Sequence, residues 1–194
     1  MGAAPLLKLS IEEYLETEAN ALEKHEFYKG EVFAMAGASI QHNQVTRNTL
    51  SAIDEHLKKS GKCQIFPSDL KVHSQVNSLF TYPDLTIICG EIETLAKHKD
   101  VVTNPTVLIE VLSASTQDYD RGSKFKLYRD IPTLKEYILI SSLEVLVEKY
   151  DKQANNTWVL QEYKTENASF IISAIGMEIQ VLSFYRDVIF AAKV

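Results

Sequence analysis

The stretch Thr106-Val-Leu-Ile-Glu-Val-Leu112 decides the fold of this chain, because it has the composition of a buried strand yet carries one carboxylate in its interior. Side chains alternate along a strand, so Glu110 is predicted to share one face with Leu108 and Leu112. A lone ionised glutamate among leucines is costly. Glu110 is therefore expected to lie near an edge, to be protonated, to pair with a cation or to bind a metal.

A second acid, Asp84, follows Pro83 at the mouth of another apolar segment, residues 85–88. Taken alone, Pro83-Asp84 indicates a turn in which the aspartate side chain caps the main chain. The two apolar segments are successive predicted strands that can lie side by side, which would bring two hard oxygen ligands together. Such a pair suits Mg²⁺ or Mn²⁺, which take one or two protein carboxylates and complete their coordination with water and substrate phosphate.

The remaining pattern predicts a mixed α/β core with a sheet flanked by helices. Ser10–Glu13 is a capping box for a first helix that ends near Lys24, and Ser39 and Gly61 delimit a second helix. A third helix is predicted over residues 116–129. Strands are predicted over residues 62–66, 70–73, 81–89, 106–112 and 136–140, and hairpins over 25–28 with 31–36 and 145–150 with 158–163. The closing region allows a strand at 170–172 and a short helix at 182–192. Without repeats or linkers, one domain over residues 1–194 is expected.

Composition points to an ordinary globular protein of 194 residues with 45% hydrophobic content. No apolar run approaches the roughly 20 residues of a membrane helix, and the first residues lack the features of a secretory signal, so a cytoplasmic location without membrane contact is expected. Cys63 and Cys89 stand singly in apparent strands. They are expected to be reduced, buried thiols rather than a zinc pair or a disulfide.

A net charge of −6 argues against broad electrostatic binding to nucleic acid. Basic residues nevertheless gather locally, and two of the clusters have the bland interpretation of solvated helix ends or loops. The third cluster adjoins the suspected site and consists of Arg121, Lys124, Lys126 and Arg129.

Several short pieces of the chain, taken in their order and spacing from about Leu9 to Tyr150, resemble one family. They are Leu9–Leu15, Glu26–Glu31 with Gly30, Gly37–Ser39 followed by His42, Pro83-Asp84, Glu110–Ser113, and Ser115-Thr116 with Asp120, Lys124 and Tyr128. The chain is similar in these pieces to the Uma2-like (DUF820) family, which is described as restriction endonucleases of the PD-(D/E)xK nuclease superfamily. The resemblance implies a restriction-endonuclease-like mixed sheet flanked by helices, with additional β-hairpins.

The resemblance also implies that Asp84 and Glu110 are metal-binding acids, with the main-chain carbonyl of Val111 as a further ligand. The chain departs from the superfamily pattern at Leu112, where a lysine is expected. Lys124 is the candidate replacement because its helix directly follows the Glu110 strand.

An alternative interpretation of Lys124 is a surface ion pair with Asp120, worth about 0.3 to 0.5 kcal/mol. Four further residues are candidates of lower rank, beside Asp120 in a supporting role. Two interpretations of Glu26 are open, a third metal ligand and an exposed acid beside a hairpin. His42 is expected to contact phosphate, to transfer a proton or simply to pack against its neighbours. Tyr128 is expected to pack over the sheet with its hydroxyl near the site, and Arg121 to contact substrate.

Other chemistries lack their motifs, because the chain has no Gly-rich phosphate loop, no G-x-S-x-G and no HExxH. The expected function is that of a Mg²⁺-dependent DNA endonuclease, with Mn²⁺ as a substitute. A homodimer is expected, since two symmetric sites can cut two strands. RNA as target and a separate specificity partner both stay open. The alternative is a non-catalytic nucleic-acid-binding or interaction module that keeps the nuclease fold.

Overall fold

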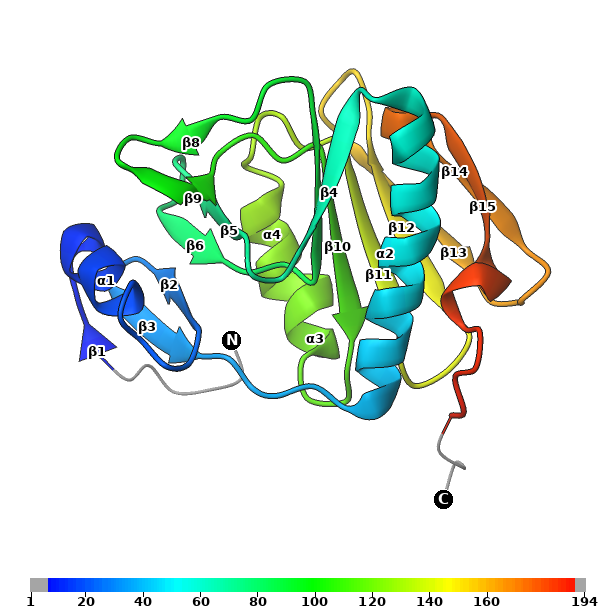
Figure 1. The fold of residues 1–194 in the computed structure, drawn as a ribbon, viewed down its shortest axis with the longest axis horizontal. Coiled ribbons are helices and arrows are strands. Elements are labelled where there is room, and N and C mark those ends of the chain that lie inside the picture. The colour runs from blue at the N-terminus through cyan, green and yellow to red at the C-terminus, as the bar shows by residue number, and fades with distance from the viewer. Residues whose placement is uncertain (1–6, 191–194) are drawn as a thin grey trace.

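The computed structural model describes residues 7–190, and its core is a mixed six-stranded sheet (Figure 1). The strand order is β13-β12-β11-β10-β7-β4, in which only β10 and β11 run parallel. These strands are β4 (Cys63–Pro67), β7 (Leu85–Cys89), β10 (Val107–Leu112), β11 (Glu136–Ser141), β12 (Val147–Lys152) and β13 (Trp158–Tyr163). A parallel pair needs a crossover connection, which is made by the helical segment between β10 and β11.

Strand β10 is buried on both faces, and its side chains alternate as the sequence predicts. Ile109 and Val111 pack in the cluster that contains Val45 and Ile53 of α2 (Ile40–Ser60). Leu108 and Leu112 of β10 pack on the opposite side, against the crossover helix. Figure 1 shows α2 and the crossover helix on either side of β10.

The crossover helix begins with α3 (Gln117–Tyr119), widens into a π-helical turn over Asp120–Lys124, and ends with α4 (Phe125–Tyr128). The predicted helix over residues 116–129 is thus confirmed in its position. The π-helical turn was not predicted, and such turns are frequent at functional sites.

A second, seven-stranded sheet has the order β1-β3-β2-β6-β5-β9-β8 and carries α1 (Ile11–Glu18) on the left in Figure 1. Its strands are β1 (Leu7–Lys8), β2 (His25–Tyr28), β3 (Glu31–Ala34), β5 (Lys71–Ser74), β6 (Leu79–Thr81), β8 (Thr94–Leu95) and β9 (His98–Val102). The stacked rings of Tyr14 and Phe27 help to fix α1 on this sheet. A small hairpin of β14 (Ser169–Ile172) and β15 (Met177–Gln180) packs with α2 on the far side of the core.

Most predicted elements are present, but several boundaries were wrong. The first helix ends at Glu18 rather than near Lys24, because the main chain at Lys24 and His25 joins the β2–β3 hairpin. The predicted strand over residues 81–89 is two strands, β6 and β7, which belong to different sheets; Tyr82-Pro83-Asp84 makes the passage between them. The short helix predicted over residues 182–192 is not formed: the chain makes a 3₁₀ turn at Val181–Phe184 and is irregular from there to residue 190. Residues 191–192 lie outside the described part of the chain.

The cysteines correct another prediction. Cys63 of β4 and Cys89 of β7 are directly opposed in the antiparallel register and form a disulfide, with their Cα atoms 4.0 Å apart. The expectation of reduced thiols was wrong because it treated the two strands separately, whereas their pairing places the sulfur atoms together. None of the helices in residues 7–190 is long and apolar enough to cross a membrane.

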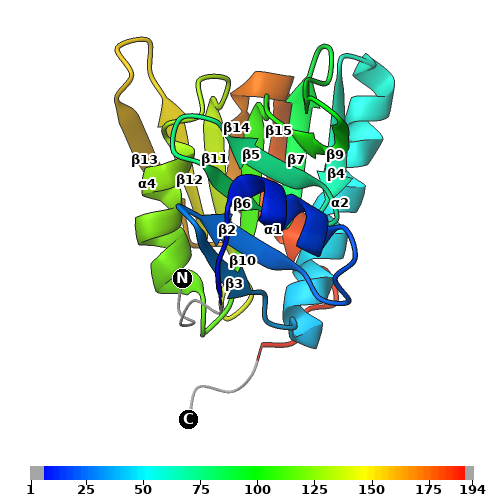
Figure 2. The ribbon, with the colours of Figure 1, turned by 90° about the vertical axis from the view of Figure 1, so that its left-hand side faces the viewer.

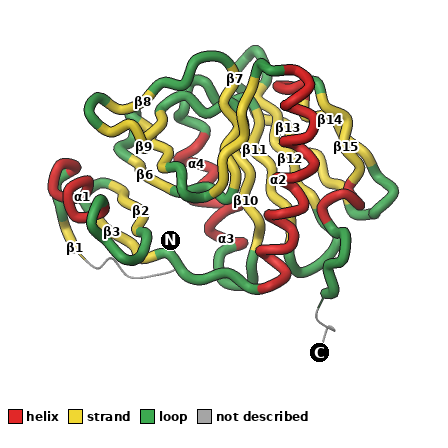
Figure 3. The backbone as a smooth tube through the Cα atoms, viewed as in Figure 1, coloured by secondary structure: helices red, strands yellow, loops and turns green. Residues whose placement is uncertain are grey.

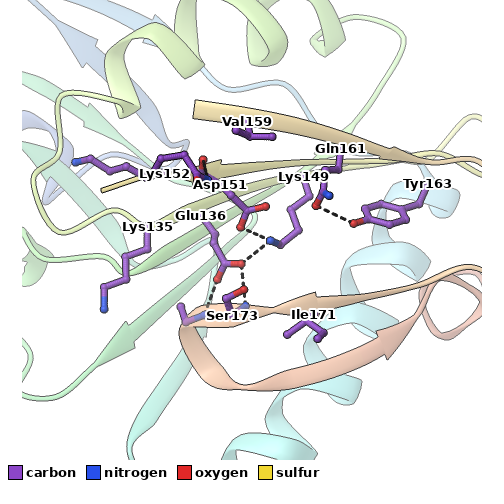
Figure 4. A pocket seen from close by; sticks show the side chains of 12 residues that line it. Lys135, Glu136, Lys149, Asp151, Lys152, Val159, Gln161, Tyr163, Ile171 and Ser173 are labelled. Carbon is purple, nitrogen blue, oxygen red and sulfur yellow. Dashed lines mark hydrogen bonds and ion pairs between the residues drawn. The ribbon is translucent and has the colours of Figure 1, made fainter. Parts of the chain in front are cut away.

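A hollow of about 700 Å³ between the β12–β13 hairpin and β14 contains a buried ion pair (Figure 4). The Nζ of Lys149 lies 2.7 Å from an oxygen of Glu136 and also contacts Asp151. Both oxygens of Glu136 accept main-chain N–H groups, from Ser173 at 2.9 Å and Ala174 at 2.8 Å. Glu136 and Lys149 are thus satisfied within the protein, and Glu136 joins the C-terminal hairpin to the central sheet.

We expect Lys149→Met to lower the free energy of unfolding by about 3 to 5 kcal/mol, because it leaves the buried Glu136 carboxylate without its cation. Chemical denaturation followed by circular dichroism measures this loss. Lys164→Met, which removes an exposed partner of Glu162, is the matched control and should change stability little. Equal effects of the two substitutions would contradict a structural role for the buried pair.

Candidate active site

The site is built where β7 begins beside the end of β10. These strands pair antiparallel with Leu85 opposite Ile109, so Asp84 and Glu110 are the next residues in register. The main-chain N–H of Asp84 lies 3.3 Å from Oε2 of Glu110, and the N–H of Val111 donates to Oδ2 of Asp84 at 2.7 Å. The prediction that the two acids lie on adjacent strands is therefore confirmed by the sheet register.

Proline also leaves the Val111 carbonyl without a main-chain donor on β7, and His42 interacts with this carbonyl. Continuing the β7–β10 register places Pro83 opposite Val111, and proline has no N–H to donate to the sheet. The N–H and C=O of one strand residue point to the same side, so this carbonyl faces the side on which Asp84 accepts the Val111 N–H.

Lys124 enters the site from the π-helical turn and is buried with 6% of its surface exposed. Its Nζ lies 2.9 Å from Oε1 of Glu110, 3.1 Å from Oε1 of Glu26 and 3.8 Å from Asp120. The alternative prediction that Asp120 and Lys124 form an ion pair on the surface is wrong, because both side chains are buried. Burial alone lowers the pKa of Lys124, but the neighbouring carboxylates outweigh it and raise this pKa well above its ordinary value. Lys124 therefore keeps its proton.

Two hydroxyls hold the acids that contact this lysine. The Tyr128 hydroxyl donates to Oε1 of Glu110 at 2.8 Å, and the Thr81 hydroxyl donates to Oε1 of Glu26 and lies 3.2 Å from the Tyr128 oxygen. The structure thus places Tyr128 over the sheet with its hydroxyl toward the suspected acids. Glu26 is buried rather than exposed, and it contacts Lys124.

His42 reaches the other side of the acid pair from the first turn of α2. Its Nε2 lies 3.2 Å from Oδ2 of Asp84, whereas its buried Nδ1 has no hydrogen-bond partner among residues 7–190. Burial lowers the pKa of His42, but the Asp84 carboxylate and the Val111 carbonyl raise it more, so the pKa lies above its usual value. The Ser39 cap fixes this turn by accepting the N–H of His42 at 3.1 Å.

Arg121 does not join these groups through any described contact. Its guanidinium binds Glu148 of β12 at 2.7 Å and Gln117 at 2.9 Å. The buried Asp120 faces Lys124, and its main-chain carbonyl accepts the Tyr137 hydroxyl at 3.1 Å. Burial raises the pKa of Asp120 against the opposing effect of Lys124.

Tyr119 also lies at the site, although no sequence motif marks it. Its hydroxyl is buried without a hydrogen-bond partner in the described part of the chain, and Nζ of Lys124 lies 5.8 Å from its ring centroid. Burial, followed by the charge of Glu26, raises the pKa of Tyr119, so this hydroxyl stays protonated. The π-helical turn, which straight α-helical spacing cannot reveal, accounts for a tyrosine five residues before Lys124 on the same side.

Negative charge exceeds positive charge around the buried lysine. Three carboxylates, those of Glu26, Glu110 and Asp120, surround the one lysine. Asp84 adds a fourth acid beside Glu110, with His42 as its basic neighbour. Burial raises the pKa of Glu110 to about 8, with Lys124 opposing the shift and Asp120 and Asp84 adding to it. The site therefore favours protonation of Glu110 or an added cation.

The donor set fits a hard divalent cation. Asp84 Oδ1 makes no hydrogen bond to another described residue, and Glu110 Oε2 accepts only the long bond from the Asp84 N–H. No three His, Cys, Asp or Glu side chains within residues 7–190 converge at metal-binding geometry. The two acids would thus be joined by the Val111 carbonyl and by water, as is common for Mg²⁺.

The fold is shared with a solved structure of low sequence identity. A solved structure described as a "putative nuclease belonging to DUF820" from Anabaena variabilis superposes with a TM-score of 0.76 over 92% of this chain and 98% of its own, at 14% identity. The restriction-endonuclease-like mixed sheet predicted from the sequence is thereby confirmed.

The chain belongs to the Uma2 family. The sequence model of this family, described as "Putative restriction endonuclease", matches residues 11–183. Two Synechocystis proteins, the uncharacterized proteins slr1290 and sll1609, are 36% and 37% identical over 188 and 165 residues. The first alignment covers 97% of both chains, and the second covers 85% of this chain and 93% of the relative.

We expect Glu110→Gln to change the pH dependence of stability. The ordinary glutamate pKa is about 4.3 in an unfolded chain, whereas it is about 8 here. Between these values the folded state binds the extra proton, so the wild-type contribution of Glu110 to stability falls as the pH rises. The free energy of unfolding of Glu110→Gln minus that of the wild type should therefore increase up to about pH 8 and then level off.

Urea denaturation in EDTA at several pH values measures this difference. Glu16→Gln, an exposed substitution on α1, is the control and should give a difference nearly independent of pH in this range. A flat difference for Glu110→Gln would mean that the Glu110 pKa is not raised.

Proposed function

We propose that this protein is a divalent-metal-dependent endonuclease that hydrolyses phosphodiester bonds in DNA, with Asp84, Glu110 and Lys124 as its catalytic group. The observation that carries the proposal is the pairing of Asp84 and Glu110 at adjoining strand ends, with Lys124 2.9 Å from Glu110. Membership in the Uma2 family supports the reaction class. Mg²⁺ is the proposed cation, with Mn²⁺ as a substitute, because the available donors are oxygens.

Asp84, Glu110 and the Val111 carbonyl would hold the cation, which when bound supplies Lewis acidity toward phosphate and lowers the pKa of water. Lys124 keeps its proton, so its role is that of a fixed donor that orients the attacking water or offsets charge developing on phosphorus. Glu26 binds this ammonium group and is assigned the role of positioning it. His42, beside Asp84, is the candidate to contact phosphate or transfer a proton.

The proposal includes a homodimer, because cutting a duplex is conveniently done by two symmetry-related sites. We assign Arg121 no direct substrate contact, since Glu148 binds its guanidinium. Nothing in the described residues marks a base-reading helix, so sequence preference is assigned to substrate shape or to a separate partner protein.

Cation binding is tested by thermal unfolding. At a Mg²⁺ or Mn²⁺ concentration 100 times Kd, a specific site should add about 2.7 kcal/mol of stability, which corresponds to roughly 5 to 10 °C in Tm for a chain of this size. Asp84→Asn should abolish this shift, whereas Asp118→Asn, an exposed acid of the same charge on α3, should retain it. Shifts of equal size in the two variants would contradict a site at Asp84.

Cleavage is tested with supercoiled, linear, branched and single-stranded DNA in Mg²⁺ or Mn²⁺. We expect Glu110→Ala and Lys124→Ala each to reduce the rate by about 100-fold or more, as removal of preorganised electrostatic groups does elsewhere, and EDTA to abolish it. Asp118→Ala and Lys58→Ala are matched controls at exposed positions and should keep the activity.

Circular dichroism must show that the Lys124 variant is folded, because two buried carboxylates lose their cation. Loss of cleavage with Glu110→Ala and EDTA, but not with Lys124→Ala, would keep the nuclease and reject the role of the lysine. Absence of both cleavage and metal binding in folded protein would instead favour a non-catalytic binding module.

A further inference from the structure

A groove of about 560 Å³ lies on the outer side of α4, between the β2–β3 hairpin and β13. Figure 2 shows α4 and β13 together on one side of the molecule, with the end of β2 beside α4. Four cations line this groove against one carboxylate, that of Asp130; they are Lys29, Lys126, Arg129 and Lys152. A surplus of cations is unusual for a chain whose net charge is −6.

These four cations are not used to neutralise the protein's own acids. None of them forms an ion pair with a carboxylate in the part of the chain that the structure describes; Arg129 lies over the Phe125 ring, and Lys152 donates to the Pro132 carbonyl. Asp130 already accepts a hydrogen bond from Asn77 at 3.0 Å. The groove thus presents unpaired positive charge to the solvent.

The basic cluster of residues 121–129 is divided between two sides of the crossover helix. Lys124 points inward to Glu110, and Arg121 is bound by Glu148. Lys126 and Arg129 are exposed on the opposite side and belong to the groove. Only this outward pair of the cluster is free to meet an external anion.

Aromatic rings complete the walls. Tyr28 and Trp158 line the groove and are both partly exposed. The Trp158 ring stands edge-on to Phe125, with ring centroids 5.4 Å apart, and Nζ of Lys29 lies 5.3 Å from the Tyr28 centroid. Cations interleaved with exposed aromatic rings are characteristic of surfaces that track a nucleic-acid backbone and tolerate any base.

The groove is joined to the candidate active site through two elements. Tyr28 and Glu26 alternate onto the same face of β2, two residues apart, and Glu26 contacts Lys124. On the helix, Lys126 follows Lys124 by two residues. Tyr128, which lies between Lys126 and Arg129 in the sequence, donates a hydrogen bond to Glu110. The groove cations and the acids lie on opposite sides of the same helix, so a strand bound in the groove would reach the acids by passing around that helix.

We propose that this groove binds the phosphodiester backbone of the nucleic-acid strand that flanks the scissile bond. The inference rests on the proposed nuclease function, and it identifies the surface that holds the substrate. Its contacts are ionic and sequence-independent, through Lys126 and Arg129 above all, and they allow an acidic protein to hold a polyanion.

Binding is measured by fluorescence anisotropy with the full chain in EDTA, so that cleavage does not interfere. The probes are labelled duplex DNA, single-stranded DNA and RNA of the same sequence, each over a series of salt concentrations. Lys126→Gln/Arg129→Gln should weaken binding on the order of tenfold or more near 100 mM salt. The slope of log K against log salt should decrease in magnitude by about 1.8 for duplex and about 1.4 for single strands.

Lys62→Gln/Lys99→Gln is the matched control, because both lysines are exposed and unpaired among the described residues and Lys62 adjoins β4, the opposite edge of the central sheet from β13. It should leave the slope unchanged. The probe that the wild-type protein binds with the lowest Kd identifies the preferred form of nucleic acid.

An unchanged slope in the groove variant would overturn the proposal, as would a slope change of equal size in the control, absence of binding to all three probes, or displacement of DNA by poly-glutamate as effective as by unlabelled DNA. Failure of the nuclease proposal is separately visible, because it concerns cleavage in Mg²⁺. A groove variant with impaired binding in a protein that cuts nothing would keep the groove and reject the activity.

Discussion

The buried ammonium group of Lys124 is the interaction on which the rest of the site depends. It contacts carboxylates from the N-terminal hairpin and the central sheet, Glu26 and Glu110, while its own chain segment is the crossover helix. Three parts of the fold that are distant in sequence are thereby fixed around one charge. Removing charges from water is expensive, so this arrangement is stable only while the ammonium group and the carboxylates remain together.

The same arrangement is electrostatically incomplete, and this explains its chemistry. Lys124 contacts three acids, and Asp84 adds a fourth beside Glu110, so one ammonium group cannot balance the negative charge. Burial and these neighbouring acids raise the pKa of Glu110, which favours the binding of another cation. Asp84 adds to the negative charge of the site. It lies where the chain leaves one sheet and enters the other, in the passage Tyr82-Pro83-Asp84. Lys124 and Tyr128 contact these buried acids, whereas Lys126 and Arg129 of the same helical segment are exposed to solvent.

Much of this arrangement could be predicted from local sequence. The alternation around Glu110 fixed the two faces of β10, and Ser39 and Gly61 marked the ends of α2. Other features depend on pairing between distant segments, which no local pattern contains. The opposition of Cys63 and Cys89 belongs to this class.

The interior position of Lys124 is another example. Its spacing from Asp120 predicted a surface pair equally well, because helical periodicity shows which residues are neighbours but not which side of the helix is buried. Glu26 and Tyr119 were ambiguous or overlooked for the same reason: their environment is created by Lys124, and the π-helical turn alters the spacing that a sequence argument assumes. The parallel pairing of β10 and β11 has one more consequence, which concerns synthesis on the ribosome. The parallel β10–β11 pair cannot form before β11 has emerged, and Glu26 cannot meet Lys124 before the crossover helix has emerged. A nascent chain thus carries the acids before it carries the lysine that they bind, and the site is assembled only when the crossover helix and β11 have both been synthesised.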